Sequence, residues 1–527
     1  MASAVSQSSG PSAEREVSFK DWIGIAATLL GAFMAVLDIQ ITNASLNEIQ
    51  AALGATLEEG SWISTSYLVA EIVVIPLTGW LSGVFSLRRY LIVNASLFLF
   101  FSVSCAFAST LPMMILFRAA QGFTGGVLIP LAFTVILTTL PSSKQPIGLA
   151  LFGITATFAP TIGPTIGGWL TDNFSWHYIF YLNLVPGLLL IAGVWYALPQ
   201  GPMQLNLLKK GDWFGIASMA IGLGSLTVVL EEGNRKDWFG SDLVVRLFMV
   251  SAIALSLFLY IEFTKREPFI NLRLLWQRNF GLSIIVTLAL GLGLYGSVFI
   301  LPLFLTQIQG YDATKIGLTI MWAGLPQLAI TPFIPILMKK FDLRFLTAVG
   351  LALFAVSCFM NSTLTENTGT LQLIPSQVVR AMGQPLVLTP LSSIATAGIA
   401  AKQVGSASAL FNMSRNLGGS TGIAALSTLL SRREQFHSSR LGESISLYNP
   451  LTQQRIEKMT QFFTSQGSFP GQAHDQAIAT IDLAVRKQAT IMAYNDCFYF
   501  MGWALMVSAL LVLLFKKTKP TGGPAGH

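Results

Sequence analysis

The sequence is poor in charged residues. Only 11% of its 527 residues are Asp, Glu, Lys or Arg, whereas 53% are hydrophobic and the mean hydropathy is +0.62. A water-soluble domain carries about 25% charged residues, so this composition excludes an ordinary soluble globule. A helix that crosses a bilayer needs about 20 mostly apolar residues, and such stretches recur along nearly the whole chain. We therefore expect an all-α polytopic membrane protein.

Cysteine and histidine are also scarce. The three cysteines, Cys105, Cys358 and Cys497, form no CxxC pair and predict no disulfide framework. The four histidines are isolated, which argues against a metal site. The sequence contains no GxxxxGKS or GxxxxGKT string, so an ATP-driven pump is not expected. We expect neither a metal nor a cofactor, and no cluster of catalytic residues supports an enzyme.

Fourteen apolar stretches are long enough to cross a membrane. Most connections between them are short, and the exception is the polar segment 431–489, which is rich in Gln and Ser and amphipathic. The predicted spans are 21–41, 61–83, 90–109, 113–139, 146–169, 178–198, 212–231, 242–262, 281–307, 315–337, 345–363, 373–398, 403–430 and 490–515.

The placement of lysine and arginine predicts the orientation of these helices. Of the 32 basic residues, 18 lie in the two tails and one set of loops, and 3 lie in the opposite short loops. Positively charged loops stay in the cytoplasm, so both termini are expected there. The segment 431–489 carries seven basic residues. It is still expected to face the periplasm, because loops of about 60 residues follow the rule poorly.

A faint internal repeat divides the chain into two halves. Arg118-Ala119 recurs 262 residues later as Arg380-Ala381, and Ala150-Leu151-Phe152 recurs 259 residues later as Ala409-Leu410-Phe411. Two six-helix halves with a substrate path between them are a transporter architecture. We expect a cytoplasmic tail at 1–20, a first half at 21–200, two inserted helices and a linker at 201–280, a second half at 281–515 with the periplasmic loop 431–489, and a cytoplasmic tail at 516–527.

Two acidic residues stand out within the predicted spans. Asp38 is late in the first span, and Glu71 is in the middle of the second. A charge inside a bilayer costs at least about 2.5–3.5 kcal/mol and is retained where it is paired or used. Burial favours the neutral form of a carboxyl, so either residue can bind and release a proton during transport. The alternative is a permanently hydrogen-bonded structural acid. Asp38 lies near the predicted periplasmic end, where water would reach it, and gating is a further alternative for it.

Three of the four arginines within or at the edge of the predicted spans are candidates for a role in transport. Arg118 is early in the fourth span, and Arg380 and Arg415 are its counterparts in the second half. Arginine stays charged and cannot carry the proton itself. Arg118 can instead make proton release from a nearby acid depend on conformation, and the alternative is a fixed ion pair that joins two helices. For Arg380 and Arg415, a structural and a functional role are equally open.

The fifth span is rich in proline and glycine. Pro160, Gly163, Pro164, Gly167 and Gly168 would disrupt a soluble helix, but neighbouring helices can satisfy the freed backbone groups in a membrane. Gly163 and Gly167 are four residues apart and allow another helix to approach closely. We expect a kinked, tightly packed helix that slides or hinges, with a generic packing motif as the alternative.

Taken together, these motifs resemble those of the fourteen-helix drug:proton antiporters of the major facilitator superfamily, and most closely the EmrB type. The resemblance covers about residues 22–515 and implies the major facilitator fold, with two six-helix halves plus two inserted helices. The matching motifs are Leu37-Asp38-x-x-Ile41-x-Asn43 in the first helix, Arg118-x-x-Gln121-Gly122 in the fourth, and Gly163-Pro164-x-x-Gly167-Gly168, which is similar to the antiporter motif.

The resemblance implies roles and partners. The arginine of the fourth-helix motif is implicated in proton transfer in the family, which points to Arg118, and the antiporter motif marks exporters. EmrB-type pumps work with a periplasmic adaptor and an outer-membrane channel, so these are the implied partners here. The candidate substrate or gating residues are Asn43, Gln121, Arg380, Asn412 and Arg415.

The sequence departs from the family pattern at several positions. Gly83 stands where the superfamily usually has an aspartate, which puts its gating ion pair in doubt, and Gln40, Asn47 and His177 replace Thr, Pro and Arg. Glu71 occupies a position that is often uncharged in relatives. This additional membrane acid suggests a cationic substrate or altered coupling.

The sequence as a whole predicts a proton-coupled exporter of amphipathic drugs or toxic compounds across the bacterial inner membrane. The expected partners are small amphipathic substrates, protons and the lipid bilayer, and nucleic acid is not among them. The alternative is an exporter dedicated to one metabolite, such as a siderophore or a fatty acid, which the sequence does not separate from multidrug export. A membrane-embedded enzyme is the third and least favoured class.

Overall fold

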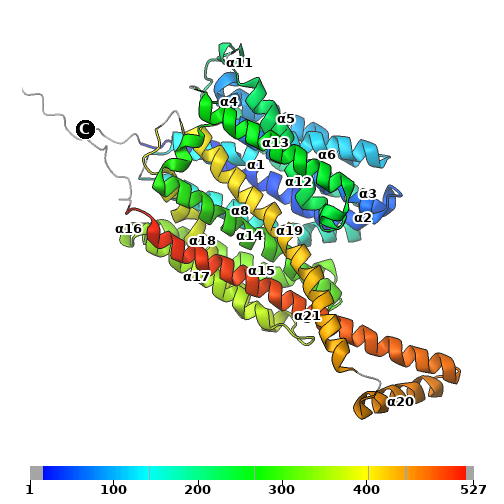
Figure 1. Ribbon diagram of the computed structural model, residues 1–527. Helices are drawn as coiled ribbons and strands as arrows, with labels where there is room; N and C mark the ends of the chain where they lie inside the picture. Colours follow the sequence, from blue (N-terminus) through cyan, green and yellow to red (C-terminus); the bar gives the residue numbers. More distant parts are fainter. Residues whose placement is uncertain are drawn as a thin grey trace, which may run out of the picture.

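The regular structure of the chain is entirely helical in the part that the computed structural model describes, residues 16–141, 143–209, 211–265, 268–400, 403–445 and 448–517. The expected all-α fold is therefore confirmed. The tails predicted at 1–20 and 516–527 fall largely outside the described residues. Figure 1 shows a bundle of long helices from which a helical hairpin projects at one end.

Twelve helical stretches of the described chain are long and apolar enough to cross a membrane. They comprise α1 (Phe19–Ala44), α4 (Trp62–Phe85), α5 (Leu87–Ala106), α6 with α7 (Leu111–Gly125 and Leu128–Thr139), α8 (Gln145–Asn173), α9 with α10 (His177–Tyr181 and Leu184–Ala197), α12 (Trp213–Glu232), α13 (Asp242–Thr264), α14 (Arg278–Gln307), α15 with α16 (Ala313–Ile330 and Ile334–Lys340), α17 (Leu343–Met360) and α21 (Pro470–Leu511).

Two further helices complete the fourteen predicted spans. The helix α18 (Thr370–Thr396) packs against α15 and α17, and α19 (Val404–Ser444) packs against α14 and α21. Each of these two helices contains a buried arginine, Arg380 in α18 and Arg415 in α19. Every span predicted from the sequence thus lies on a helix of the described chain.

Several helices begin where the sequence supplies a capping side chain. The Ser18 side chain accepts a hydrogen bond at the start of α1. Asp312 and Asp342 accept hydrogen bonds from the backbone N–H groups of Lys315 (2.7 Å) and Arg344 (2.9 Å) at the starts of α15 and α17. Such caps satisfy N–H groups that have no partner within the helix. A side-chain hydrogen bond from Arg344 also holds the pKa of Asp342 below its ordinary value.

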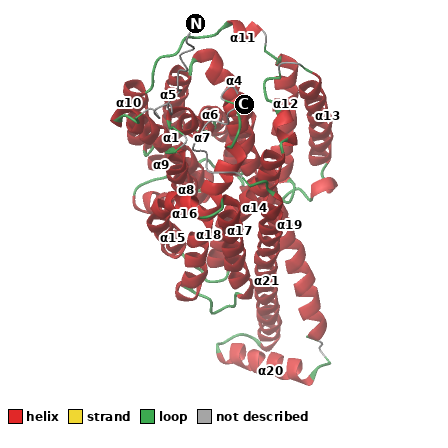
Figure 2. Ribbon diagram, turned by 90° about the vertical axis from the view of Figure 1, so that its left-hand side faces the viewer, coloured by secondary structure: helices red, strands yellow, loops and turns green. Residues whose placement is uncertain are grey.

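The segment 431–489, predicted as a long loop, is largely helical. The helix α19 continues to Ser444, α20 (Pro450–Ser465) follows at the tip, and α21 begins at Pro470. Because a helix satisfies its own backbone hydrogen bonds, α19 and α21 can continue beyond the apolar stretches into a polar environment. The short helix α20 packs along α21. Figure 2 shows this hairpin at the opposite end of the molecule from α11 (Asn206–Lys209).

A charged cluster joins the two arms of the hairpin at its base. Asp496 of α21 accepts a hydrogen bond from Arg433 Nε of α19, and its Oδ2 atom lies 2.8 Å from Nε2 of His437. The cluster fixes α19 and α21 side by side where they leave the bundle.

The first six and the last six spanning stretches meet through a small set of helices. The helix α8 packs against α15 and α18, and α4 and α7 pack against α19. The helices α12 and α13 pair with each other, and α12 also contacts α4 and α19. Side chains of α8 and α19 therefore lie at the boundary between the two sets of helices.

Candidate functional site

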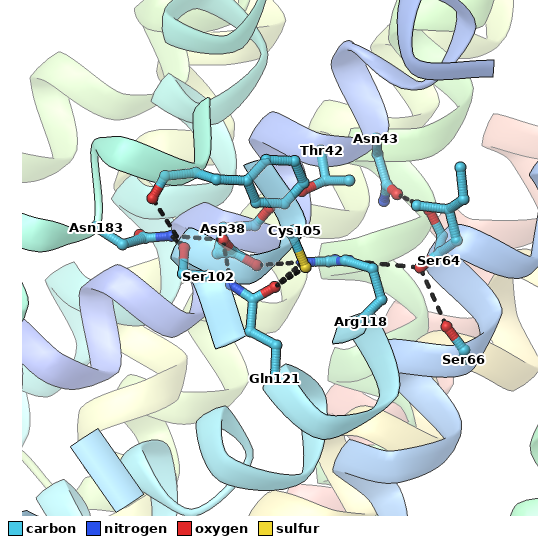
Figure 3. Close-up of polar contacts among 12 residues, drawn as sticks. Asp38, Thr42, Asn43, Ser64, Ser66, Ser102, Cys105, Arg118, Gln121 and Asn183 are labelled. Carbon is cyan, nitrogen blue, oxygen red and sulfur yellow. Dashed lines mark hydrogen bonds and ion pairs between the residues drawn. The ribbon is translucent and has the colours of Figure 1, made fainter. Parts of the chain in front are cut away.

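A buried ion pair joins α1 to α6. The Nη1 atom of Arg118 lies 2.6 Å from Oδ2 of Asp38, and the two residues are 1% and 3% exposed (Figure 3). The sequence predicts that water reaches Asp38, and this prediction is wrong. The carboxylate is bound by polar side chains from α6 and from the turn between α9 and α10.

Amide groups complete the coordination of the Asp38 carboxylate. Its Oδ1 atom accepts hydrogen bonds from Nε2 of Gln121 (3.0 Å) and from Nδ2 of Asn183 (2.6 Å). Arg118 also donates to Oε1 of Gln121 at 2.8 Å, and Asn183 donates to the Ser102 hydroxyl at 3.0 Å. Figure 3 shows these side chains converging on Asp38. The network holds one carboxylate and one guanidinium, so it is electrically neutral as long as Asp38 is ionised.

Aromatic rings close the network on the side of Arg118. The guanidinium carbon lies 4.3 Å from the centre of the Tyr67 ring and 5.9 Å from that of Phe180. A methyl group at Gly122, four residues after Arg118, would collide with the backbone of Tyr67. The absence of a side chain at Gly122 therefore lets α6 lie close enough to α4 for this contact.

Glu71 contacts the other half of the chain instead of the Asp38 network. Its Oε1 atom accepts a hydrogen bond from Nδ2 of Asn416 at 3.1 Å, and the Tyr295 hydroxyl donates to Oδ1 of Asn416 at 3.3 Å. Glu71 is 3% exposed. The interaction thus runs from α4 across the boundary to α19 and α14.

A cavity of about 70 Å³ adjoins Glu71 and holds a second acid, Glu231 of α12. Asn43 lines the same cavity and accepts a hydrogen bond from the Ser64 hydroxyl at 2.6 Å, so it lies apart from the Asp38 network. Glu231 does not stand out in the sequence, because it is the last residue of a predicted span, where an acid ordinarily meets water. Its proximity to Glu71 comes from the packing of α12 against α4.

Arg380 and Arg415 line another cavity between the two sets of helices. They are 4% and 2% exposed, and their guanidinium carbons lie 5.8 Å from the rings of Phe354 and Phe152. In the described part of the chain, all three guanidinium nitrogens of Arg415 and the Nε atom of Arg380 have no hydrogen-bond partner. The two residues predicted from the repeat are thus brought together, without a carboxylate paired to either.

Asn412 lies near these residues in sequence but belongs to neither cavity lining. It is fully buried, and its Nδ2 atom donates to the carbonyl oxygen of Ser408 at 2.9 Å, within α19. Its contact is therefore local to the helix.

The proline- and glycine-rich helix α8 is packed between helices on two sides. A methyl group at Gly167 would lie 2.9 Å from the carbonyl oxygen of Ile41, and one at Gly163 would collide with the side chain of Gln40. Pro160 lines the cavity of Arg380 and Arg415. Gly168 is buried, and Pro164 is partly buried within the same helix. Gly163 and Gly167 both face α1, so the close approach of α8 to α1 depends on these small residues.

Metal ligands do not cluster in the described ranges, where no group of three or more His, Cys, Asp or Glu residues is placed to hold a metal ion. The carboxyl groups of the site can bind protons, and its guanidinium and amide groups can recognise a ligand through charge and hydrogen bonds.

Comparison with known proteins gives a consistent result. The sequence profile of the Major Facilitator Superfamily matches residues 28–423. The chain is 34% identical to the colistin resistance protein EmrB of Acinetobacter baumannii over 499 residues, which cover 94% of this chain and 97% of that protein. It is 30% identical to the multidrug export protein EmrB of Escherichia coli K12 over 503 residues, 95% of this chain and 96% of that one.

Two further similarities concern a named substrate class and the fold. The fatty acid resistance protein FarB of Neisseria gonorrhoeae is 30% identical over 507 residues, covering 96% of this chain and 98% of that protein. The solved structure of the proton:xylose symporter XylE superposes with a TM-score of 0.61 at 12% identity, over 96% of this chain and 98% of that one. The latter similarity concerns the fold alone.

Proposed function

Because the chain belongs to the major facilitator superfamily, among relatives of the EmrB-type multidrug export proteins, we propose that it is a proton-driven antiporter that exports amphipathic compounds. It is a multi-pass membrane transporter, not an enzyme, and its family uses no cofactor. The proposal concerns the driving ion, the direction of transport and the substrate class.

The observation that carries the proposal is the buried Asp38–Arg118 pair. Removing one partner of a buried ion pair costs about 3–5 kcal/mol, because it leaves an uncompensated charge. Protonation of Asp38 has the same effect on Arg118, since it removes the neutralising charge 2.6 Å away. The neutral arrangement is therefore favoured when Asp38 is ionised, and another arrangement of α1 and α6 is favoured when it is protonated. This is the link between proton binding and conformation that antiport requires.

Each site residue has a role in this scheme. Asp38 binds the proton, and Arg118, which stays charged, makes proton release depend on conformation. Gln121 and Asn183 hold the Asp38 carboxylate in place through hydrogen bonds. Glu71 is a second proton-binding group, at the cavity that it shares with Glu231.

The helix α8 is the moving interface of the proposed cycle. It contacts α1 within the first half and α15 and α18 across the boundary. Gly163 and Gly167 allow close approach to α1, and small-residue interfaces of this kind permit helices to slide without large side chains interlocking. Relative motion of the halves about α8 would expose the cavities to the two sides of the membrane in turn.

The orientation and the partners are part of the proposal. The distribution of lysine and arginine supports cytoplasmic termini, which places the hairpin of α19, α20 and α21 in the periplasm of the bacterial inner membrane. In this position the hairpin is available to a periplasmic adaptor that leads to an outer-membrane channel. The EmrB-type relatives support this arrangement through sequence similarity.

A second candidate function is export of one dedicated metabolite, such as a siderophore or a fatty acid. One observation favours it, namely the cavity that contains Arg380 and Arg415, because two arginines suit an anionic substrate. One relative is named a fatty acid resistance protein. The two candidates share the proton-coupling network and differ in the range of substrates.

The test uses the full chain in liposomes with an imposed proton gradient and a pH-reporting dye. We expect amphiphiles to evoke proton flux in the wild type, and we expect Asp38→Asn and Arg118→Gln to reduce it to about a tenth or less, because each leaves an unbalanced site. Glu71→Gln is compared in parallel. Asp482→Asn, which removes an exposed acid of the hairpin, is the matched control and should transport normally.

Substrate-dependent proton flux that persists in Asp38→Asn and Arg118→Gln would contradict the assigned coupling pair. If only Glu71→Gln abolished the flux, Glu71 would be the coupling residue. If no amphiphile moved protons in any variant, proton antiport itself would be rejected.

A further inference from the structure

The cavity that contains Arg380 and Arg415 lies where both halves of the bundle meet. Its volume is about 10 Å³, room for about one water molecule, so a larger ligand enters it only when the halves separate. Its lining comes from four helices and consists of Ala156, Pro160, Leu294, Tyr295, Val298, Arg380, Gln384 and Arg415.

Three side chains of this cavity carry hydrogen-bond donors that lack an acceptor in the described residues, whereas the Tyr295 hydroxyl donates to Asn416. Within the described chain, no partner is present for the three guanidinium nitrogens of Arg415, for Nε of Arg380 or for Nε2 of Gln384. Burial of a charge without a partner is costly. Guanidinium groups match carboxylates and other oxyanions through paired hydrogen bonds. An acceptor that is not part of the chain would satisfy all three side chains.

The internal repeat shows which group is absent from the chain itself. Arg118 and Arg380 are repeat equivalents, and Arg118 is neutralised by Asp38 at 2.6 Å. The repeat spacing of 259–262 residues carries Asp38 onto residues 297–300 of α14, which read Ser-Val-Phe-Ile. The second half therefore keeps the arginine and lacks the carboxylate, and Val298 from this stretch lines the cavity.

The neighbouring acid does not replace this carboxylate. Glu71 lies within electrostatic reach of Arg415, but its Oε1 atom accepts a hydrogen bond from Asn416, and the described residues form no ion pair between Glu71 and either arginine. The cavity therefore keeps a net positive charge in the described conformation.

We propose that Arg380 and Arg415, with Gln384, bind the anionic head of an amphipathic substrate. The inference rests on the proposed exporter function and deepens it by naming the substrate class. The missing carboxylate of the second half is supplied by the transported molecule.

The experiment compares two amphiphiles of equal chain length and opposite fixed charge, decanesulfonate and decyltrimethylammonium, with the purified full chain. Neither probe carries a titrating proton, so neither confounds a pH readout. We expect the wild type to bind and transport decanesulfonate in preference. Arg380→Gln and Arg415→Gln should each weaken its binding by about tenfold or more. Arg246→Gln, which removes an exposed arginine, is the matched control.

Thermal unfolding distinguishes ligand binding by Arg380 and Arg415 from a purely structural role of these residues. Without ligand, Arg415→Gln should raise the Tm, because it removes a buried charge that has no partner. Decanesulfonate should then raise the Tm of the wild type but not that of the Arg380→Gln/Arg415→Gln double variant. A lower Tm in Arg415→Gln, together with unchanged decanesulfonate binding, would overturn the proposal.

The outcomes separate this inference from the exporter function. Transport of decyltrimethylammonium with no effect of the arginine substitutions would leave the exporter and reject the anion site. Decanesulfonate binding that depends on both arginines, without transport of any amphiphile, would support the site and reject the exporter. The Asp38→Asn variant should lose proton coupling and keep decanesulfonate binding.

Discussion

At the residue scale, two equivalent arginines occupy different electrostatic environments. Arg118 has Asp38 at 2.6 Å and aromatic rings nearby, whereas the Arg380 guanidinium lies 5.8 Å from the Phe354 ring and its Nε atom has no hydrogen-bond partner in the described residues. The first arrangement is a neutral unit whose charge balance a single proton changes. The second is a charge that a bound anionic ligand would neutralise. In our proposals, the same residue type therefore serves proton coupling in one half and substrate recognition in the other.

The buried pair should show strong coupling in a double-mutant cycle. We expect Asp38→Asn and Arg118→Gln each to destabilise the protein by about 3–5 kcal/mol, because each leaves one buried charge unpaired. The destabilisation of the double variant should be clearly smaller than the sum of the destabilisations of the two single variants. Thermal unfolding in detergent provides the measurement.

An exposed pair serves as the control for this cycle. Asp482 and Arg486 of α21 lie 2.7 Å apart and are more than half exposed. Exposed pairs contribute about 0–1 kcal/mol, so the same substitutions there should leave the Tm nearly unchanged. Strict additivity of Asp38→Asn and Arg118→Gln would show that the two charges do not depend on each other.

The sequence predicts the charged members of the site better than their partners. Asp38, Glu71 and Arg118 stand out because a charge within an apolar stretch is costly. Asn183 does not stand out as a partner of Asp38, because 145 residues separate them and only the packing of α10 against α1 brings them together. The hydration predicted for Asp38 failed for the same reason, since tertiary packing encloses it.

At the element scale, α8 meets two structural requirements that its proline and glycine residues already indicate. It must span the membrane despite Pro160 and Pro164, and it must lie close to α1 and α15. At Gly324 of α15 a methyl group would lie 3.1 Å from Phe158. The helix is therefore closely packed on both sides.

Two Gly→Ala substitutions on α8 distinguish the effect of close packing from the effect of helix propensity, because both add the same methyl group to the same helix. Gly167→Ala places a methyl group 2.9 Å from the backbone of α1 and should cost about 1–3 kcal/mol through overpacking, with a reduced transport rate. Gly153→Ala on the same helix meets its nearest atom at 3.5 Å and should be tolerated. Tm and transport rate are measured for both variants. Equal behaviour of the two would argue against a close, functional α1–α8 interface.

The apolar stretches of the sequence predict that each helix exists, but they do not predict how long it is. Each predicted span lies on a helix, but α19 ends at Ser444 and α21 begins at Pro470, well outside the predicted limits at 430 and 490. Hydropathy marks where a helix enters lipid. Beyond that point, the ion pairs at Asp496 and the packing of α20 on α21 keep the chain helical.

At the scale of the whole molecule, the bundle and the hairpin have separate tasks in our proposal. The bundle holds both cavities and the coupling pair, and the hairpin projects from one end (Figures 1 and 2). The exposed apolar residues Leu451, Phe462 and Phe469 lie on α20 or next to the start of α21. Exposed apolar groups of this kind are typical of protein-interaction surfaces.

Replacing residues 450–465 with a short Gly/Ser linker tests this division. We expect transport in liposomes to stay near the wild-type rate, because the bundle is unchanged, and we expect drug resistance of cells to be lost, because the adaptor contact is removed. Equal loss in liposomes would mean that the hairpin supports the bundle. Full drug resistance of cells that carry the replacement would show that α20 is not needed for contact with the adaptor.

The continuity of α19 has a consequence for regulation. One helix of 41 residues contains Arg415 at the cavity and the first arm of the hairpin, and the stretch from Arg415 to Ser444 measures about 44 Å at about 1.5 Å per residue. In our proposals, α19 therefore connects the binding site of the substrate head group directly to the hairpin, so a movement of the helix at one end would displace the other end. Thermodynamic reciprocity then requires that, if substrate binding changes the affinity of the tip for a partner, the partner changes the affinity for substrate by the same factor. The docked partner would thus be an effector of the pump as well as its outlet.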